Sequence, residues 1–164
     1  MANEAPEASQ ESAQTPQGRP GPYVDSGVLI KLYVLEPNSA GAARMVGAFP
    51  SVNLYPFQEL EVRNTLQALE GRASITAAQR AAAEHEFERD VVLGRLRRAI
   101  PDWSEVFKTA MRLSSEHGAA TLARSLDIIH VAIAITVQAE PFITGDHRQR
   151  SVAQREGLST EMLE

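Results

Sequence analysis

Apolar residues gather in short runs and helical stripes from Tyr23 onward, whereas the first twenty residues contain no Val, Ile, Leu or aromatic side chain. A segment of this composition cannot bury enough apolar surface to offset the entropy lost on ordering. We therefore expect residues 1–21 to form a disordered, polar and acidic tail. Residues 22–161 are expected to form a single folded domain.

After the tail, the pattern alternates between strands and helices. Short apolar runs predict strands, and stretches bounded by capping residues, Pro or Gly predict helices. The expected strands are 23–25, 52–55, 96–100 and 141–144, and the expected helices are 26–35, 39–48, 56–71, 76–93, 102–118, 125–137 and 146–157. Helices between strands are typical of βαβ units, so the predicted fold class is α/β with a parallel sheet.

The segment 125–137 is apolar on nearly every face, with Leu126 and Ile128 among its apolar side chains. A helix that is apolar all round is a buried one, so we expect this helix in the core. Its central run, 128–137, is too short to cross a membrane, which takes ~20 residues. With no apolar leader sequence either, the sequence predicts a cytoplasmic protein without a membrane partner.

Composition removes several classes of site. The chain has no Cys, which excludes a thiol nucleophile, a disulfide scaffold and every Cys-based zinc or iron–sulfur site. Its net charge of −5 argues against broad electrostatic adhesion to nucleic acid. No Gly-rich phosphate loop is present, which excludes a dinucleotide-binding or P-loop protein. An Asp-nucleophile phosphohydrolase is disfavoured, because the second Asp it needs is replaced by Gly27.

Two acids directly follow predicted strands. Asp25 comes after the first strand and Asp146 after the last, and each begins a predicted helix. Ligands of open α/β sheets bind outside the carboxyl ends of the strands, so both acids belong at one edge of the sheet. The alternative is that each Asp is only a helix cap.

Two further positions carry candidate acids. Asp127 lies in the first turn of the apolar helix, where it either compensates the helix dipole or is neutralised by a bound cation. Glu59 and Glu61 lie about 200° apart on their helix, so only one can face a given site. Glu61 lies on the same side as Asn64 and Thr65, which favours Glu61 over a merely solvated helix face.

Four segments together resemble those of PIN-domain ribonucleases, specifically the VapC-type toxins of type II toxin–antitoxin systems. They occur in the family's order and are 23–31 (YVDSGVLIK), 59–66 (ELEVRNTL), 124–132 (RSLDIIHVA) and 142–146 (FITGD). The resemblance implies a PIN-like fold with 4–5 strands. It places the family's four acids on Asp25, Glu61, Asp127 and Asp146, and its common small hydroxyl residue on Thr144.

The chemistry implied is metal-dependent RNA hydrolysis that leaves a 5′-phosphate and a 3′-hydroxyl. Clustered carboxylates need a counter-charge, and oxygen-only ligands favour Mg²⁺ or Mn²⁺. We expect Asp25, Asp127 and Asp146 to hold the metal and Glu61 to act as a ligand or to orient the attacking water. Ser26 and Thr144 are expected to hydrogen-bond to these acids.

The expected partners are an RNA substrate, a cognate antitoxin and a second copy of the chain in a homodimer. Arg63, Arg124 and Arg148 are the predicted RNA contacts, and Arg150 and Lys31 are further positions near the motifs. His130, three residues after Asp127, is interpreted mainly as a packing residue. The alternative function is a PIN-fold module that binds RNA or an antitoxin without cleaving anything.

Overall fold

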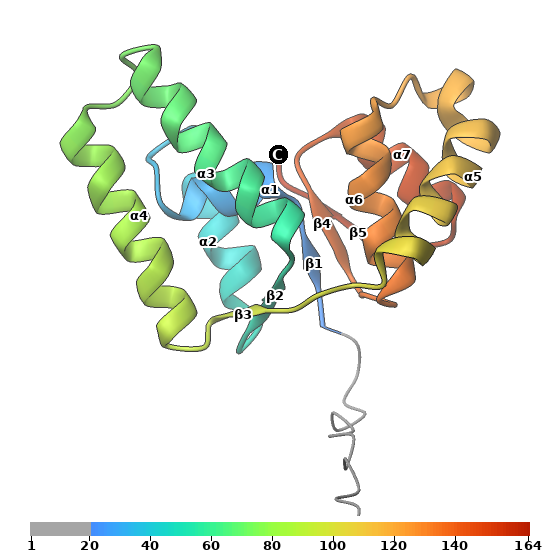
Figure 1. The fold of residues 1–164 in the computed structure, drawn as a ribbon, viewed down its shortest axis with the longest axis horizontal. Coiled ribbons are helices and arrows are strands. Elements are labelled where there is room, and N and C mark those ends of the chain that lie inside the picture. Colours follow the sequence, from blue (N-terminus) through green and yellow to red (C-terminus); the bar gives the residue numbers. More distant parts are fainter. Residues whose placement is uncertain (1–20) are drawn as a thin grey trace, which may run out of the picture.

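The computed structural model describes residues 21–164 and shows an α/β protein with two short parallel sheets (Figure 1). The first sheet has the order β1-β4-β5, from strands β1 (Tyr23–Val24), β4 (Phe142–Thr144) and β5 (Thr160–Met162). The second pairs β2 (Val52–Leu54) with β3 (Leu96–Arg98). The α/β class and the parallel pairing agree with the sequence prediction, but the five strands form two sheets where one was expected.

Helices cover both sides of these strands. They are α1 (Ser26–Leu29), α2 (Ser39–Gly47), α3 (Pro56–Gly71), α4 (Ala77–Val92), α5 (Trp103–Thr121), α6 (Ser125–Thr136) and α7 (His147–Arg155). In Figure 1, α2, α3 and α4 lie on the left of the strands and α5, α6 and α7 on the right. The expected tail, 1–21, lies almost entirely outside the described residues.

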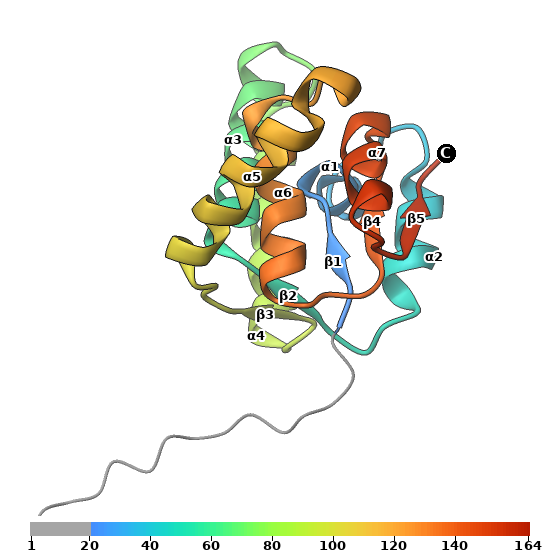
Figure 2. The same cartoon turned by 90° about the vertical axis from the view of Figure 1, so that its right-hand side faces the viewer.

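Alternation along the central strands creates two hydrophobic cores. Tyr23 and Phe142 pack with α5, α6 and α7, whereas Val24 and Ile143 pack with α1 to α4. Successive strand side chains point to opposite faces, so each two-residue step along β1 and β4 supplies both cores. The strands therefore lie between two helical layers and contribute side chains to both, as Figure 1 and Figure 2 show from two sides.

The predicted helix 26–35 is shorter and differently capped. α1 ends at Leu29 and continues only as a 3-10 turn, Ile30–Leu32. Its cap is Asp25 and not Ser26, because the Asp25 carboxylate accepts a hydrogen bond from Gly27 N at 3.1 Å. The chain then turns back through a loop that leads to α2.

Two other expectations need correction. Leu126, expected on a buried helix, has half of its surface exposed, although Ile128 and residues 130–134 of α6 are buried. β5 was not predicted, since its residues are polar or only partly buried and lie at the sheet edge. An edge strand of this kind carries no apolar run for a sequence pattern to detect.

Candidate active site

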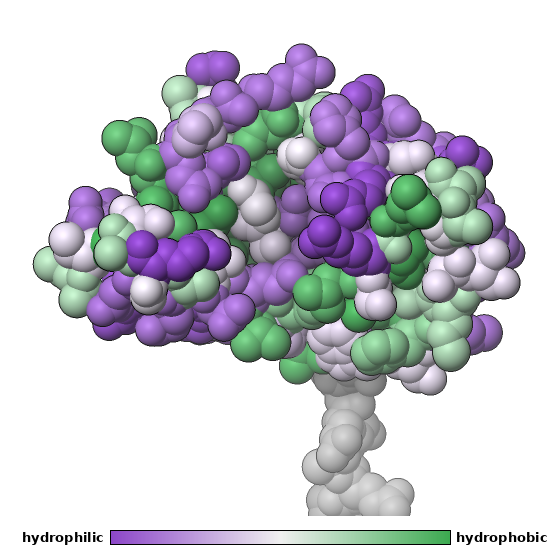
Figure 3. All heavy atoms as spheres, turned by 90° about the horizontal axis from the view of Figure 1, so that it is seen from above, coloured by the Kyte–Doolittle hydropathy of each residue, from purple (hydrophilic) through white to green (hydrophobic). Residues whose placement is uncertain are grey.

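One pocket, of about 510 Å³, lies at the carboxyl ends of β1 and β4. Hydrophilic side chains gather over this edge of the molecule in the view from above (Figure 3). All four acids selected from the sequence line the pocket: Asp25, Glu61, Asp127 and Asp146. Each comes from a different segment, so only the folded chain brings them together.

The local structure explains why each acid lies where it does. Asp25 and Asp146 follow β1 and β4 and cap α1 and α7, so the parallel strands deliver both to one edge. Asp127 lies in the first turn of α6, where one carboxylate oxygen accepts a hydrogen bond from Arg124 N at 2.8 Å. Capping and pocket lining are therefore compatible roles, because a carboxylate has two oxygens.

Asp25 lines the pocket and is buried, with 5% of its surface exposed. Its Oδ1 accepts hydrogen bonds from Gly27 N and Ser26 Oγ, and its Oδ2 accepts one from Thr144 Oγ1 at 3.1 Å. Thr144 Oγ1 in turn accepts a hydrogen bond from Asp146 N at 2.9 Å. Thr144 thus connects the two acids that follow β1 and β4.

Glu61 reaches the pocket from α3 and is held by a buried histidine. Glu61 Oε2 lies 2.7 Å from His130 Nε2 and accepts a hydrogen bond from Ser26 Oγ at 2.8 Å. His130 is 2% exposed, its Nδ1 lies 2.8 Å from the hydroxyl of Tyr23, and its ring packs edge-on against Phe57. The ring position is therefore determined from three sides.

The protonation of this pair follows from its surroundings. Burial by itself lowers the pKa of His130, but the hydrogen bond to Glu61 and the charges of Asp25, Glu61 and Asp127 raise it above its usual value. Burial raises the pKa of Glu61, yet His130 and Ser26 bring it below its usual value. The raised pKa of His130 and the lowered pKa of Glu61 both favour a protonated imidazolium paired with an ionised carboxylate.

His130 is the site residue whose importance sequence reasoning underestimated. Its spacing places it one turn after Asp127, which was the available signal, but it was interpreted mainly as a packing residue. The contact with Glu61 joins α6 to α3, two helices that belong to different cores. No pattern within a single helix can show such a contact.

The three aspartates of the pocket have no arginine or lysine partner among the described residues. Among residues 21–164, neither Asp127 nor Asp146 forms an ion pair, and Asp25 meets only His130, at 3.5 Å. Asp127 and Asp146 each use one carboxylate oxygen for the backbone of their helix, Asp146 Oδ1 accepting from Arg148 N and Gln149 N. The second oxygen of each has no hydrogen bond to the described chain.

Glu59, the other candidate on α3, lies outside this pocket. It accepts hydrogen bonds from Arg63 and Arg98, and Arg63 and Arg98 also pair with Glu88. These pairs hold the pKa of Glu59 below its usual value, with Arg98 as the largest cause. Of the two acids on α3, the structure brings Glu61 to the other acids.

The predicted RNA contacts are dispersed. Arg124 lines the pocket, whereas Arg63 belongs to the ion pairs with Glu59 and Glu88 and lies over the ring of Phe87. Arg148 contributes its backbone N to the Asp146 cap but does not line the pocket. Their role toward RNA stays a prediction.

The donor set of the pocket fits a hard divalent cation, which prefers carboxylate oxygens. The tightest ligand group among the described residues is elsewhere: ligand atoms of Glu116, His117 and Glu156 lie within 4.8 Å of one another. There Arg112 already pairs with both glutamates. Among the described residues, the pocket acids do not bring three ligand atoms within that distance of one another.

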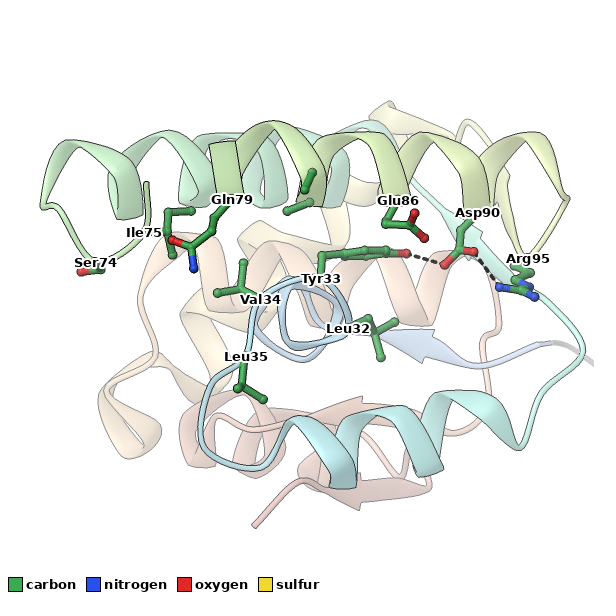
Figure 4. Close-up of a pocket in the computed structure, with 12 residues that line it drawn as sticks. Leu32, Tyr33, Val34, Leu35, Ser74, Ile75, Gln79, Glu86, Asp90 and Arg95 are labelled. Atoms are coloured by element: carbon green, nitrogen blue, oxygen red, sulfur yellow. Dashed lines mark hydrogen bonds and ion pairs between the residues drawn. The ribbon is translucent and has the colours of Figure 1, made fainter. Parts of the chain in front are cut away.

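A larger pocket, of about 640 Å³, lies between α4 and the loop after the 3-10 turn (Figure 4). Its principal polar contacts are already formed within the chain. Tyr33 donates a hydrogen bond to Asp90 at 3.0 Å, and Asp90 pairs with Arg95 at 3.0 Å. Burial, followed by the Asp90 charge, raises the pKa of Tyr33 well above its usual value. Both acids of this pocket are matched by arginines, Asp90 by Arg95 and Glu86 by Arg89, so among the described residues it offers no free carboxylate comparable with those of the first pocket.

Of three comparisons with known proteins, the one with solved structures bears on the fold. No protein-family model matches the sequence, and no curated protein matches it. Among solved structures, the chain is similar to a chain in the crystal structure of VapBC2 from Rickettsia felis bound to a DNA fragment from their promoter. The TM-score is 0.60 at 12% identity, over 86% of this chain and 97% of that chain. At this identity the likeness shows the fold. None of the described helices is long and apolar enough to cross a membrane.

Proposed function

We propose that this chain is a metal-dependent endoribonuclease with a PIN-type fold and acts as the toxin of a toxin–antitoxin pair. One observation carries the proposal. Asp25, Asp127 and Asp146, from three separate segments, line one pocket without an arginine or lysine partner among the described residues. Partly buried carboxylates left in this way call for a cation that the chain does not supply.

In this proposal Asp25, Asp127 and Asp146 hold Mg²⁺ or Mn²⁺. When bound, such an ion polarises a phosphodiester and lowers the pKa of water enough to make it a nucleophile at neutral pH. The unbonded carboxylate oxygens of Asp127 and Asp146 are the free ligand atoms that support this assignment.

The chain itself orients the reacting groups. Gly27 and Thr144 hold the carboxylate of Asp25 in one orientation, because Gly27 N donates a hydrogen bond to Oδ1 and Thr144 Oγ1 donates one to Oδ2. His130 and Ser26 both bind Glu61 Oε2, which leaves Glu61 Oε1 free to accept a hydrogen bond from a water. A carboxylate kept ionised by an imidazolium is suited to accept a hydrogen bond from that water and so to orient it.

The proposal includes partners. A cognate antitoxin is supported by the VapBC2 complex, in which the similar chain was crystallised. An antitoxin that presents an Arg or Lys to the pocket would neutralise the carboxylates and displace the metal. A homodimer, an RNA substrate and a cytoplasmic location belong to the same proposal.

The test is cleavage of a mixed cellular RNA pool by the purified chain, freed from any antitoxin. Reactions contain Mg²⁺, Mn²⁺ or EDTA, and the 5′-phosphate ends are mapped by sequencing. We expect discrete cuts that require metal and disappear in an Asp25→Asn, Asp146→Asn double variant. If the folded wild-type chain makes no metal-dependent cut, the alternative of a non-catalytic binding module replaces this proposal.

Metal binding is measured separately, by thermal unfolding. A cation that binds only the folded chain stabilises it by about 2.7 kcal/mol at 100 times its Kd. We expect Mn²⁺ to raise the Tm of the wild-type chain and to have little effect on the double variant. A Glu116→Gln variant, which alters the other ligand group, should respond to Mn²⁺ as the wild type does. Equal responses of the wild type and the double variant would contradict the metal assignment.

A further inference from the structure

The rim of the acid pocket carries an ion pair that the chemistry above does not use. Lys31 Nζ lies 2.9 Å from Glu36 Oε2, and both residues line the pocket. Their side chains are 22% and 28% exposed, so the pair is partly shielded from solvent. Among the residues that line this pocket, Lys31 and Arg124 are the only ones with a permanently cationic side chain.

Both members of the pair are held in place by the backbone. Lys31 belongs to the 3-10 turn that continues α1, directly after the segment that carries Asp25 and Ser26. The loop back to Glu36 is fixed by Ser39, which accepts a hydrogen bond from Glu36 N at 3.0 Å and donates one to Val34 O. The loop conformation is therefore maintained without the side-chain ion pair.

The basic member of the pair is a lysine, in a chain whose other basic residues are nearly all arginines. The chain has only two lysines, Lys31 and Lys108, among its sixteen basic residues. Lysine presents a compact, mobile positive charge, which binds a phosphate as a point charge and can exchange partners easily. Glu36 adds a fifth carboxylate to a pocket that already has four, and it neutralises one of the two cations that line the pocket.

We propose that Lys31 is an RNA-phosphate-binding residue and that Glu36 holds its ammonium at the pocket rim until a phosphate replaces the glutamate. In the RNA-free chain, Glu36 competes with the substrate for Lys31. With RNA bound, the ammonium moves to a phosphate oxygen of the strand that enters the pocket. This inference rests on the proposed function, because it assumes an RNA substrate in the acid pocket.

The two partners should then affect RNA binding in opposite directions. Lys31→Met removes the phosphate contact and should weaken binding about tenfold, as expected for a hydrogen bond between charged groups. Glu36→Gln removes the competing carboxylate and should tighten binding several-fold. A pair with only a structural role would give no such opposition, because losing either partner breaks the same contact.

Binding is measured by fluorescence anisotropy with a labelled RNA dodecamer of degenerate sequence in Mg²⁺. All variants are made in an Asp146→Asn background, in which the proposed function predicts no turnover. A salt titration gives a second readout: each phosphate contact to a single strand contributes about 0.7 to the slope of log K against log salt. Lys31→Met should reduce the slope by about that amount, and Lys31→Arg should retain it.

Lys108→Met is the matched control. Lys108 pairs with Glu105 at 3.5 Å on α5, is 75% exposed and does not line the pocket, so its variant should bind RNA like the parent. Thermal unfolding of each variant verifies folding. Unchanged affinity and slope in Lys31→Met, or equal loss in the Lys31→Met and Glu36→Gln variants, would overturn the inference.

Cleavage kinetics in the wild-type background separate the two proposals. If the wild-type chain cleaves RNA and Lys31→Met raises KM with little change in kcat, both proposals are supported. If the wild-type chain cleaves RNA and Lys31→Met has unchanged KM, only the Lys31 inference fails. If the wild-type chain cleaves nothing, the nuclease proposal fails, while the binding measurements still decide the role of Lys31.

Discussion

Two groups of carboxylates in this molecule differ in what neutralises them. In the acid pocket, Asp25, Asp127 and Asp146 have no arginine or lysine partner among the described residues. The second group lies away from this pocket. Glu59 pairs with Arg63 and Arg98, and both arginines also bind Glu88. Glu156 pairs with Arg112. None of the chain's fourteen arginines pairs with the three aspartates of the acid pocket among the described residues.

The difference teaches how to separate functional from structural acids in one chain. A partly exposed carboxylate beside an arginine is neutralised within the chain, and such a pair contributes modestly to stability. A half-buried carboxylate without such a partner is costly, unless a ligand completes it. The pocket acids are therefore the ones on which a reaction can depend.

The largest expected contrast is between matched acid-to-amide substitutions in the two groups. Asp127→Asn should lower kcat/KM for metal-dependent RNA cleavage about 10³-fold, because it removes an anionic ligand without changing side-chain size. Glu59→Gln, on the arginine-bound acid of α3, should leave kcat/KM within about twofold. Both are measured on one RNA substrate under multiple-turnover conditions. Equal losses in the two variants would remove the distinction between the groups.

A smaller contrast concerns stability. His130→Leu removes a buried imidazolium and leaves Glu61 and the Tyr23 hydroxyl without their partner. Loss of one partner of a buried pair costs about 3 kcal/mol of unfolding free energy, measured by urea denaturation. Arg98→Ala, in an outer network with 49% of the arginine side chain exposed, should cost at most about 1 kcal/mol.

The stability of the His130–Glu61 pair also tests the contrast between the two groups of carboxylates. If His130→Leu costs no more than Arg98→Ala, the buried pair behaves like a surface pair and its special status is lost. If the expected difference is found, the four acids selected from the sequence divide into Glu61, which His130 neutralises, and three aspartates without an arginine or lysine partner among the described residues. That division matches the proposed roles of one water-orienting acid and three metal ligands.

The smallest expected effect is the pH dependence of an outer network. Arg112 foremost, and then His117, hold the pKa of Glu156 below its usual value against the opposing effect of burial. A lowered pKa in the folded state stabilises the fold above the unfolded-state pKa of about 4.5, and this contribution is lost as the pH falls through the folded-state pKa. Glu156→Gln should therefore flatten the acid side of the stability curve by about 0.5–1 kcal/mol. Urea denaturation between pH 7 and pH 3 measures it, and a slope unchanged from the wild type would contradict the assignment.

Local patterns predicted most helices of this chain within a few residues. The helix from Pro56 to Gly71 and the Thr76 cap of α4 were expected at the positions where the structure has them. These features depend on residues only a few positions apart, such as a proline in the first turn or a cap three residues from its backbone donor. The split of the sheet and the edge strand β5 depend on distant segments, and the sequence pattern missed both.

The same physical reason divides the site. Asp25 and Asp146 were found from sequence because each follows a strand and begins a helix, and parallel strands bring such residues to one edge. The sequence interpretation favoured Glu61 over Glu59, and the tertiary structure places Glu61 beside them through the way α3 is rotated against α6. Only the tertiary structure decides that His130 binds Glu61, because 69 residues of chain separate the two and no local pattern spans that distance.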